Sequence, residues 1–248
     1  MITFKRSLWQ NEFEQYTFDF EGRTAIIVFP HDTNKTTKWI MKMEYFDAFQ
    51  DMELQLVKRG FHLVYLQNVS RWVGADDLET KYRFRNFIVN QFSLKKKGVF
   101  IGFSCGGLHS IRQAAKYPDM VSCLYLDAPV VNLLSVPFGL GNHPPFDSSM
   151  KEELLNALHM NMSDVIKYRE HPLDKIPTLI ENRIPLLLVC GGSDSVVPYD
   201  ENGYFLKLAY EESQIPFLFL YNSEREHHPH VPMDDQIENA LQFIIQHC

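Results

Sequence analysis

Gly102-Phe103-Ser104-Cys105-Gly106 is the stretch that decides the fold. It follows an uncharged run at 99–101 that is typical of a buried strand, and it leads into a helix-compatible stretch. Glycines on both sides of Ser104 permit a sharp strand-to-helix turn that pushes the hydroxyl clear of the chain. The same turn points the amide of Cys105 and the N-terminus of the helix at any atom bonded to Ser104, which makes half of an oxyanion hole. The alternative is an ordinary glycine-rich turn that merely contains a serine.

Apolar runs alternate with helical patterns on both sides of this turn, as in a mostly parallel sheet with helices on both faces. An antiparallel hairpin comes first, because 15–20 alternates strictly and meets the turn pair Glu21-Gly22 before the run 24–29. Further strands are predicted at 61–66, 98–103, 121–126, 185–190 and 216–221. Helices are predicted over about twenty residues ending at Lys58-Arg59-Gly60, over about 78–93, from Gly106 to Tyr117, and over about 200–213 and 234–247.

The alternation breaks between Pro129 and Ile184. Glycines and prolines mark a loop near 139–145, and short helices are predicted at 149–159 and 163–170. We expect residues 130–184 to form a small helical lid over the carboxyl ends of the strands. The chain 1–248 is then a single α/β domain with an insertion.

Length, composition and charge narrow the class of protein. The 248 residues, 45% hydrophobic and 22% charged, are enough for a domain with a sizeable core. A net charge of −7 argues against non-specific binding of nucleic acid. The N-terminal residues do not resemble a signal peptide, and no run approaches the roughly 18–20 apolar residues of a membrane span. We expect a soluble, cytoplasmic protein with no membrane contact, and a homodimer is left open.

A catalytic serine needs a base, and the base needs a group that fixes its tautomer. In a parallel α/β sheet these residues belong on loops at the carboxyl ends of strands. Asp194 lies in such a loop, and three histidines, His227, His228 and His230, follow the last predicted strand. The chain order Ser, Asp, His is the one expected of a hydrolase with a nucleophile elbow. We therefore take Ser104, Asp194 and His227 as the candidate catalytic group.

Two of these positions have alternatives. His228 and His230 compete with His227 for the role of base, and Asp127, at the end of the preceding strand, competes with Asp194 for the role of acid. Asp127 is otherwise a structural carboxylate that caps the next turn. We predict no metal site, because no Asp, Glu or Cys partner of the histidines stands at recognisable ligand spacing. The four cysteines form no Cys-x-x-Cys pair, so neither zinc nor a disulfide framework is expected.

The second oxyanion donor is expected in the loop after the strand 24–29. Pro30 has no N–H, so the amide of His31 or Asp32 is the candidate. Trp39 and Lys42 stand three residues apart at the start of the next predicted helix and are expected to border the substrate pocket. Phe103 is expected to line the acyl side of that pocket or to fill the core.

With these residues in place, the chain resembles the α/β-hydrolase superfamily over nearly its whole length. It is most similar to the small bacterial serine esterases of the prolyl-oligopeptidase-like branch. The segments that carry the resemblance are 61–65, 102–108, 124–129, 194–199 and 227–230. The resemblance implies an α/β-hydrolase fold, with Ser104 as nucleophile, Asp194 as orienting acid and His227 as base. Cys105 departs from the family pattern, as does the charged stretch Glu224-Arg225-Glu226 where relatives tend to have glycines.

The predicted activity is hydrolysis of a small carboxylic ester through an acyl-enzyme, without a cofactor. Thioesters and peptides are alternatives that the same three residues would serve. The competing class is a non-catalytic binding module of the same fold, which usually lacks the serine or the histidine. A dinucleotide-binding dehydrogenase is excluded, because no Gly-x-Gly-x-x-Gly turn occurs early in the chain.

Overall fold

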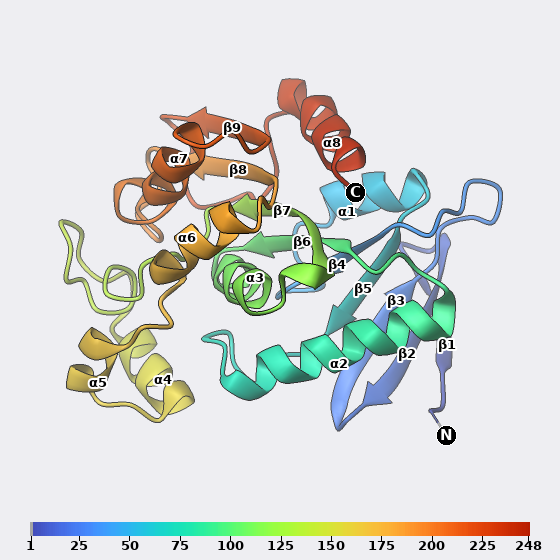
Figure 1. Ribbon diagram of the computed structural model, residues 1–248, viewed down its shortest axis with the longest axis horizontal. Coiled ribbons are helices and arrows are strands. Elements are labelled where there is room, and N and C mark those ends of the chain that lie inside the picture. Colours follow the sequence, from blue (N-terminus) through green and yellow to red (C-terminus); the bar gives the residue numbers. More distant parts are fainter. Residues whose placement is uncertain (1) are drawn as a thin grey trace.

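The computed structural model describes residues 2–248, which form a nine-stranded sheet with helices on both faces (Figure 1). The strands follow the order β1-β2-β3-β5-β4-β6-β7-β8-β9 across the sheet. Their bounds are β1 Lys5–Trp9, β2 Phe13–Phe20, β3 Arg23–Val28, β4 Trp39–Lys42, β5 His62–Leu66, β6 Gly98–Phe103, β7 Val121–Asp127, β8 Leu186–Gly191 and β9 Phe217–Asn222.

The sheet has an antiparallel part and a parallel part. Strands β1 to β3 form an antiparallel meander at one edge, and β3 pairs antiparallel with β5. From β5 through β4 and β6 to β9, all pairs are parallel. The carboxyl ends of these six strands therefore meet at one edge of the sheet, where ligand sites of α/β folds lie.

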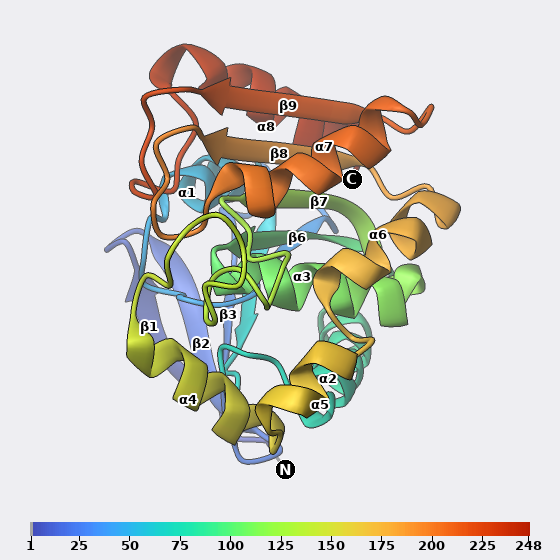
Figure 2. The same ribbon diagram turned by 90° about the vertical axis from the view of Figure 1, so that its left-hand side faces the viewer.

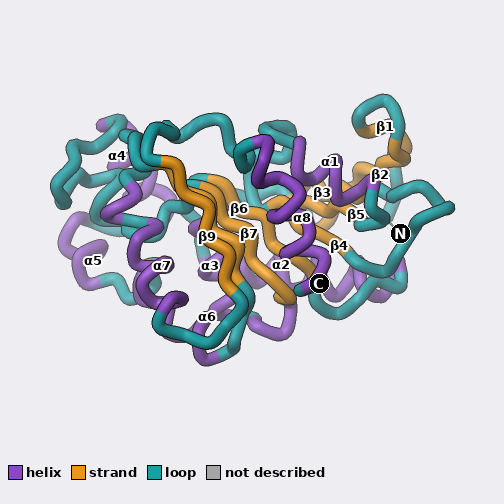
Figure 3. Tube along the Cα trace, turned by 90° about the horizontal axis from the view of Figure 1, so that it is seen from above, coloured by secondary structure: helices purple, strands orange, loops and turns teal. Residues whose placement is uncertain are grey.

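Helices cover the two faces unequally (Figures 1 and 3). The helices are α1 Asp51–Lys58, α2 Ala75–Phe92, α3 Cys105–Lys116, α4 Ser148–Leu158, α5 Met162–Lys167, α6 Pro172–Glu181, α7 Gly203–Glu211 and α8 Ile237–Gln246. One face carries α1 and α8, and the other carries α2, α3, α6 and α7. Within residues 2–248, every helix is too short or too polar to cross a membrane.

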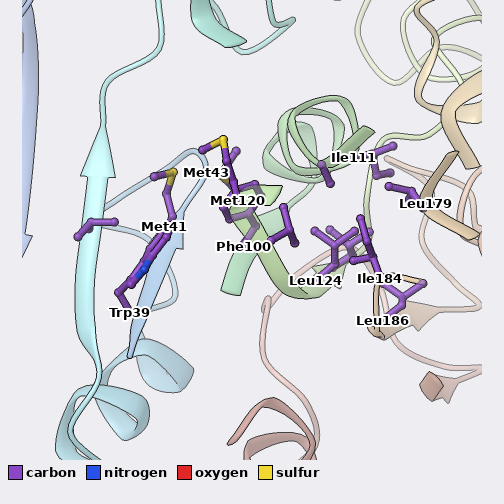
Figure 4. Close-up of a cluster of buried hydrophobic side chains, with 14 of the residues drawn as sticks. Trp39, Met41, Met43, Phe100, Ile111, Met120, Leu124, Leu179, Ile184 and Leu186 are labelled. Atoms are coloured by element: carbon purple, nitrogen blue, oxygen red, sulfur yellow. The ribbon is translucent and has the colours of Figure 1, made fainter. Parts of the chain in front are cut away.

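Each face of the sheet has its own hydrophobic core. The larger cluster packs the sheet against α2, α3, α6 and α7, and its centre joins Trp39, Phe100 and Leu124 to Ile111 and Leu179 (Figure 4). The smaller cluster lies under α1 and α8. Strands buried on both faces read as continuous apolar runs, which is why β5, β6, β7 and β8 were recognisable in the sequence.

The predicted helix of about twenty residues before Gly60 is wrong. Its first part is β4, a four-residue strand between β5 and β6 that is buried on both faces, and its last part is the short helix α1. The three-residue spacing of Trp39 and Lys42 predicts neighbours on one helix face. Both are fully buried strand residues, and Lys42 is accommodated by an ion pair with Glu53.

The segment between β7 and β8 contains more regular structure than predicted. Helices α4 and α5 agree with the predicted short helices, but α6 was missed because Pro172 and Pro177 lie within it. Helix α6 packs beside α3 and α7, whereas α4 and α5 lie apart from the sheet (Figure 2). A third apolar cluster beneath α4 and α5 includes Trp72, Leu108 and Leu154.

Candidate active site

Ser104 lies in the predicted sharp turn between β6 and α3. Its backbone has φ 51° and ψ −118°, a conformation that non-glycine residues rarely adopt. Its amide donates to the carbonyl of Asp127 (3.1 Å), and its carbonyl accepts from the amides of Gly107 (2.9 Å) and Val130 (3.0 Å). These bonds to the end of β7 and to the loop beyond it hold the strained turn in place.

Two glycines are required for this turn because other atoms occupy the space of a side chain. A Cβ on Gly102 would lie 2.3 Å from the hydroxyl oxygen of Ser110, and a Cβ on Gly107 would lie 2.4 Å from the Cβ of Pro129. Both distances are well below van der Waals contact. The glycines therefore let α3 start directly against β6 and the loop after β7, which leaves Ser104 only half-buried.

Asp194 and His227 form a buried pair at the same edge. Oδ2 of Asp194 lies 2.8 Å from Nδ1 of His227. Oδ1 of Asp194 accepts hydrogen bonds from the amides of Val196 (2.9 Å) and Val197 (2.8 Å), so the carboxylate is fixed by its own loop. The contact with the carboxylate places the proton of the imidazole on Nδ1 and leaves the lone pair on Nε2. Such a histidine is oriented to accept a proton.

A second histidine–carboxylate pair lies beside the first. Nδ1 of His230 is 3.0 Å from Oδ1 of Asp127, and one guanidinium nitrogen of Arg225 donates to both oxygens of Asp127, at 2.7 and 2.9 Å. Arg225 also donates to the carbonyl of Pro229 at 2.7 Å. Burial lowers the pKa of His230 despite the neighbouring Asp127. The sequence offered Asp127 and His230 as alternatives to Asp194 and His227, and the structure instead gives each acid its own histidine.

His230 connects the histidine loop to the strand that carries Ser104. Its ring stacks on Phe103, with centroids 5.2 Å apart, and meets the ring of His227 edge-on at 4.7 Å. Phe103 immediately precedes Ser104, and Ser104 is hydrogen-bonded to the backbone of Asp127. The loops after β6, β8 and β9 thus lie at one edge of the sheet (Figure 2), and His230 links the Asp194–His227 pair to Phe103, the residue before Ser104.

No protein-family model and no curated protein matches the chain. Solved structures do match it. The fluorophosphonate-binding serine hydrolase FphF of Staphylococcus aureus has a TM-score of 0.69 and 16% identity, over 94% of this chain and 98% of that one. An S-formylglutathione hydrolase from Agrobacterium tumefaciens has a TM-score of 0.66 and 13% identity, over 99% of both chains. The chain has the α/β-hydrolase fold.

Larger proteins also contain this fold. Dipeptidyl peptidase 4 of Porphyromonas gingivalis has a TM-score of 0.71 and 16% identity over 100% of this chain. The chain spans about a third of the peptidase's length, since it covers 35% of it. The match therefore concerns about a third of that enzyme and shows that the two chains share a fold.

The α/β-hydrolase topology shows that the predicted second oxyanion donors are wrong. Strand β3 runs antiparallel to β5, so its end at Val28 pairs with Leu63 near the amino end of β5. His31 and Asp32 follow β3 and are therefore at the edge opposite Ser104. His31 is exposed and bonds to Glu12, 3.0 Å away. The error came from treating β3 as the parallel strand that precedes the oxyanion loop.

The loop after β4 occupies the position at which an α/β-hydrolase supplies that donor. Met43 begins this loop, and its amide donates to the carbonyl of Ile101 in β6. The amide nitrogen of Glu44 lies 3.5 Å from the place a Cβ would take on Gly106, in the first turn of α3. Tyr45 has a positive φ of 55°. Since β4 was predicted as helix, the sequence carried no indication that Glu44 lies beside the first turn of α3.

Trp39 and Lys42, which were predicted to border the substrate pocket, belong to the core instead, and Phe103 takes the second of its two predicted places, the core. Trp39 lies at the amino end of β4, and its indole N–H donates to the carbonyl of Lys95. Phe103 is 1% exposed and packs edge-on against Tyr125 at 5.6 Å. Nζ of Lys42 lies 3.7 Å from the centre of the Phe103 ring and is hydrogen-bonded to the carbonyl of Ala48. Lys42 and Phe103 therefore belong to the buried packing next to Ser104 and are not exposed to a substrate.

Cys105, next to Ser104, does not have the properties of a reactive thiol. Its thiol is buried, and burial raises its pKa to about 11. A thiol with that pKa stays protonated at neutral pH, whereas the thiolate is the reactive form. The contribution expected of Cys105 is therefore its backbone N–H, at the N-terminus of the twelve-residue helix α3.

Proposed function

We propose that this protein is a serine hydrolase in which Ser104 is the nucleophile, His227 the base and Asp194 the group that orients the base. The observation that carries the proposal is the buried 2.8 Å contact between Asp194 and His227 beside a strained serine turn. A binding module has no need of a half-buried serine in a strained backbone or of an imidazole with a fixed tautomer. The serine hydrolases among the structures of the same fold agree with this assignment.

The proposed reaction is acyl transfer in two steps. Nε2 of His227 takes the proton of the Ser104 hydroxyl as its oxygen attacks the carbonyl carbon of the substrate. The N–H of Cys105 and one from the loop 44–45 stabilise the oxyanion. The tetrahedral intermediate collapses, and the leaving group departs with the proton from His227. Water then attacks the acyl-enzyme by the same route and releases the acid.

The proposed substrate is a carboxylic ester of modest size. We propose that residues 130–184 act as a lid, of which α4 and α5 are the part that stands away from the sheet. These two short helices leave little cover for a long acyl chain. Thioesters and peptides are served by the same residues, and S-formylglutathione hydrolase and dipeptidyl peptidase 4 are among the structures with this fold.

Covalent labelling tests the proposal. A fluorophosphonate probe should modify one residue of the native protein, and peptide mass analysis should place the adduct on Ser104. The variant Ser104→Ala should take up no probe, and its hydrolysis of p-nitrophenyl acetate should fall to the uncatalysed rate. Ser110→Ala, which changes another serine of α3, is the matched control and should still be labelled. Labelling of Ser104→Ala equal to that of the native protein would reject the assignment.

A series of p-nitrophenyl esters then tests the substrate class. Activity should be highest for short acyl chains and decrease as the chain lengthens. A preference for long chains, or for peptide amides over esters, would reject the small-ester proposal while leaving the nucleophile in place.

A further inference from the structure

Three imidazoles from one short loop meet at the site. A ring nitrogen of each of His227, His228 and His230 lies within 4.8 Å of a ring nitrogen of the other two. Their ring centroids are 4.7, 4.7 and 4.9 Å apart. The spacing His-His-Pro-His gave no such indication, because adjacent residues usually point in different directions. Here the loop turns all three side chains toward one another.

Two of the three imidazoles are held as metal ligands usually are. Nδ1 of His227 faces Asp194, and Nδ1 of His230 faces Asp127, so Nε2 is the free nitrogen of both rings. A carboxylate on one ring nitrogen fixes the tautomer and strengthens the other nitrogen as a donor to a metal. The third ring, His228, is exposed and stacks on Phe49 at 5.4 Å. It is the one free to turn.

We propose that His227, His228 and His230 form an inhibitory site for Zn²⁺. The inference rests on the proposed function, since inhibition requires His227 to be the base. A bound ion takes the lone pair of Nε2 of His227, which is the pair that would accept the proton of Ser104. Metal binding and hydrolysis then exclude each other. The step forms nitrogen–zinc bonds on neutral imidazoles and displaces water from the ion, with no change of oxidation state.

The geometry requires only a small movement. Two nitrogens bound to one tetrahedral zinc at 2.0–2.1 Å are about 3.4 Å apart, so the present separations close by up to ~1.4 Å. Rotation of the exposed His228 supplies part of this movement, and small rotations of the His227 and His230 rings about their contacts with the carboxylates supply the rest. His228 also lines an open pocket of about 530 Å³, together with Asn222, residues 224–226, Pro229 and residues 231–234, so it is the ring that an ion from solvent meets first.

The charges around the cluster favour a cation. Asp194 and Asp127 are buried against two of the rings, while Arg225 is the cation paired with Asp127. Glu224 and Glu226 flank Arg225 and line the same pocket as His228. Three neutral imidazoles with an open fourth position suit Zn²⁺ better than Mg²⁺ or Ca²⁺, which prefer oxygen ligands.

The test measures binding separately from activity. The protein of residues 1–248 is treated with a chelator, freed of it, and titrated with ZnCl₂ by calorimetry in a buffer that does not bind zinc. The native protein should bind one equivalent, and His228→Ala should bind at least about tenfold more weakly because one of three ligands is lost. His31→Ala, which removes an exposed histidine at the opposite edge of the sheet, should bind as the native protein does.

Hydrolysis of p-nitrophenyl acetate provides the second readout. Zinc should inhibit the native enzyme, and EDTA should restore it. His228→Ala should hydrolyse the ester normally without zinc and require at least about tenfold more zinc for half-inhibition. Equal zinc binding by His228→Ala and the native protein would overturn the site. Zinc bound through His228 without any inhibition would overturn the participation of His227. If the native protein hydrolyses nothing, the proposed function fails, and calorimetry still decides whether the site exists.

Discussion

The two histidine–carboxylate pairs of the site differ in what neutralises the carboxylate. Asp194 is held by two backbone amides and one imidazole, and no cation is among its hydrogen-bond partners in residues 2–248. Asp127 is held by Arg225 as well as by His230. In the first pair the negative charge is available to stabilise an imidazolium that forms during a reaction. In the second pair the charge is already compensated by a guanidinium.

This difference shows how the same two residue types serve chemistry in one place and structure in another. A base is useful only if its protonated form is stabilised when it appears. Asp194 supplies this stabilisation to protonated His227. Asp127 would stabilise protonated His230 less, because its negative charge is already paired with Arg225. Asp127 instead connects the end of β7 to the histidine loop through His230 and Arg225. The ring of His230 in turn stacks on Phe103, which precedes Ser104. We therefore expect the two pairs to respond to mutation in opposite ways.

The largest expected effect is on catalysis. Asp194→Asn should lower kcat/KM for p-nitrophenyl acetate by about 10⁴-fold, because an amide favours the wrong tautomer of His227 and offers no negative charge to its protonated form. The free energy of unfolding should change little, since the side chain can keep its bonds to the backbone amides. Steady-state kinetics and urea denaturation of the same preparation measure both quantities. A variant that keeps native activity would show that Asp194 is not the orienting acid.

The next effect is on stability. Asp127→Asn should lower the free energy of unfolding by about 3–5 kcal/mol, because it leaves Arg225 largely buried beside a neutral group. The folded protein should lose far less activity than Asp194→Asn does. Urea denaturation measures the change in stability. The matched control is Glu21→Gln, which breaks the pair of Glu21 with Arg83, where both side chains are exposed, and should cost at most about 1 kcal/mol.

The reverse outcome would exchange the two roles. If Asp127→Asn abolished activity at native stability while Asp194→Asn remained active, Asp127 would be the acid and His230 the base. That alternative is the one the sequence left open.

The sequence predicted the position of a residue correctly where that position depends only on the strand that the residue follows. Ser104, Asp194 and the histidines were located because each follows an apolar run, and parallel strands place their carboxyl ends at one edge. Strands β5, β6, β7 and β8 were recognised as continuous apolar runs, whereas β4, only four residues long and containing Lys42, was not. The glycines of the serine turn were interpretable because local geometry alone requires them.

The errors arose where the outcome depends on a neighbouring strand. Whether β3 is parallel or antiparallel decides at which edge His31 lies, and a single strand carries no sign of its direction in the sheet. Lys42 looked like a polar helix residue because its partner Glu53 is eleven residues away. Arg225 was noted only as a departure from the family pattern. Its pairing with Asp127, 98 residues earlier, depends on tertiary contacts.

His62, a buried histidine outside the site, has no carboxylate among its hydrogen-bond partners within residues 2–248 and can be compared with His227 and His230. His62 in β5 is 1% exposed, and its Nδ1 lies 3.3 Å from the carbonyl of Lys38. Burial lowers its pKa from 6.5 to about 4. The unfolded chain then binds a proton more readily than the folded protein between these pH values. His62 therefore adds no destabilisation above pH 6.5, and the native state loses stability as the pH falls from 6.5 to 4.

The substitution His62→Phe removes this titration, and the aromatic ring retains the edge-on packing against Phe29. Between pH 7.5 and 4.5 the native protein should lose about 2.5 kcal/mol more stability than the variant. Urea denaturation of both proteins at a series of pH values gives the difference and cancels the titration of all other groups. Parallel pH profiles for the two proteins would mean that His62 is protonated as readily in the folded state as in the unfolded chain. A buried imidazole would then be protonated readily without a carboxylate beside it. The contact with Asp194 would no longer be needed to explain how a proton on His227 is stabilised.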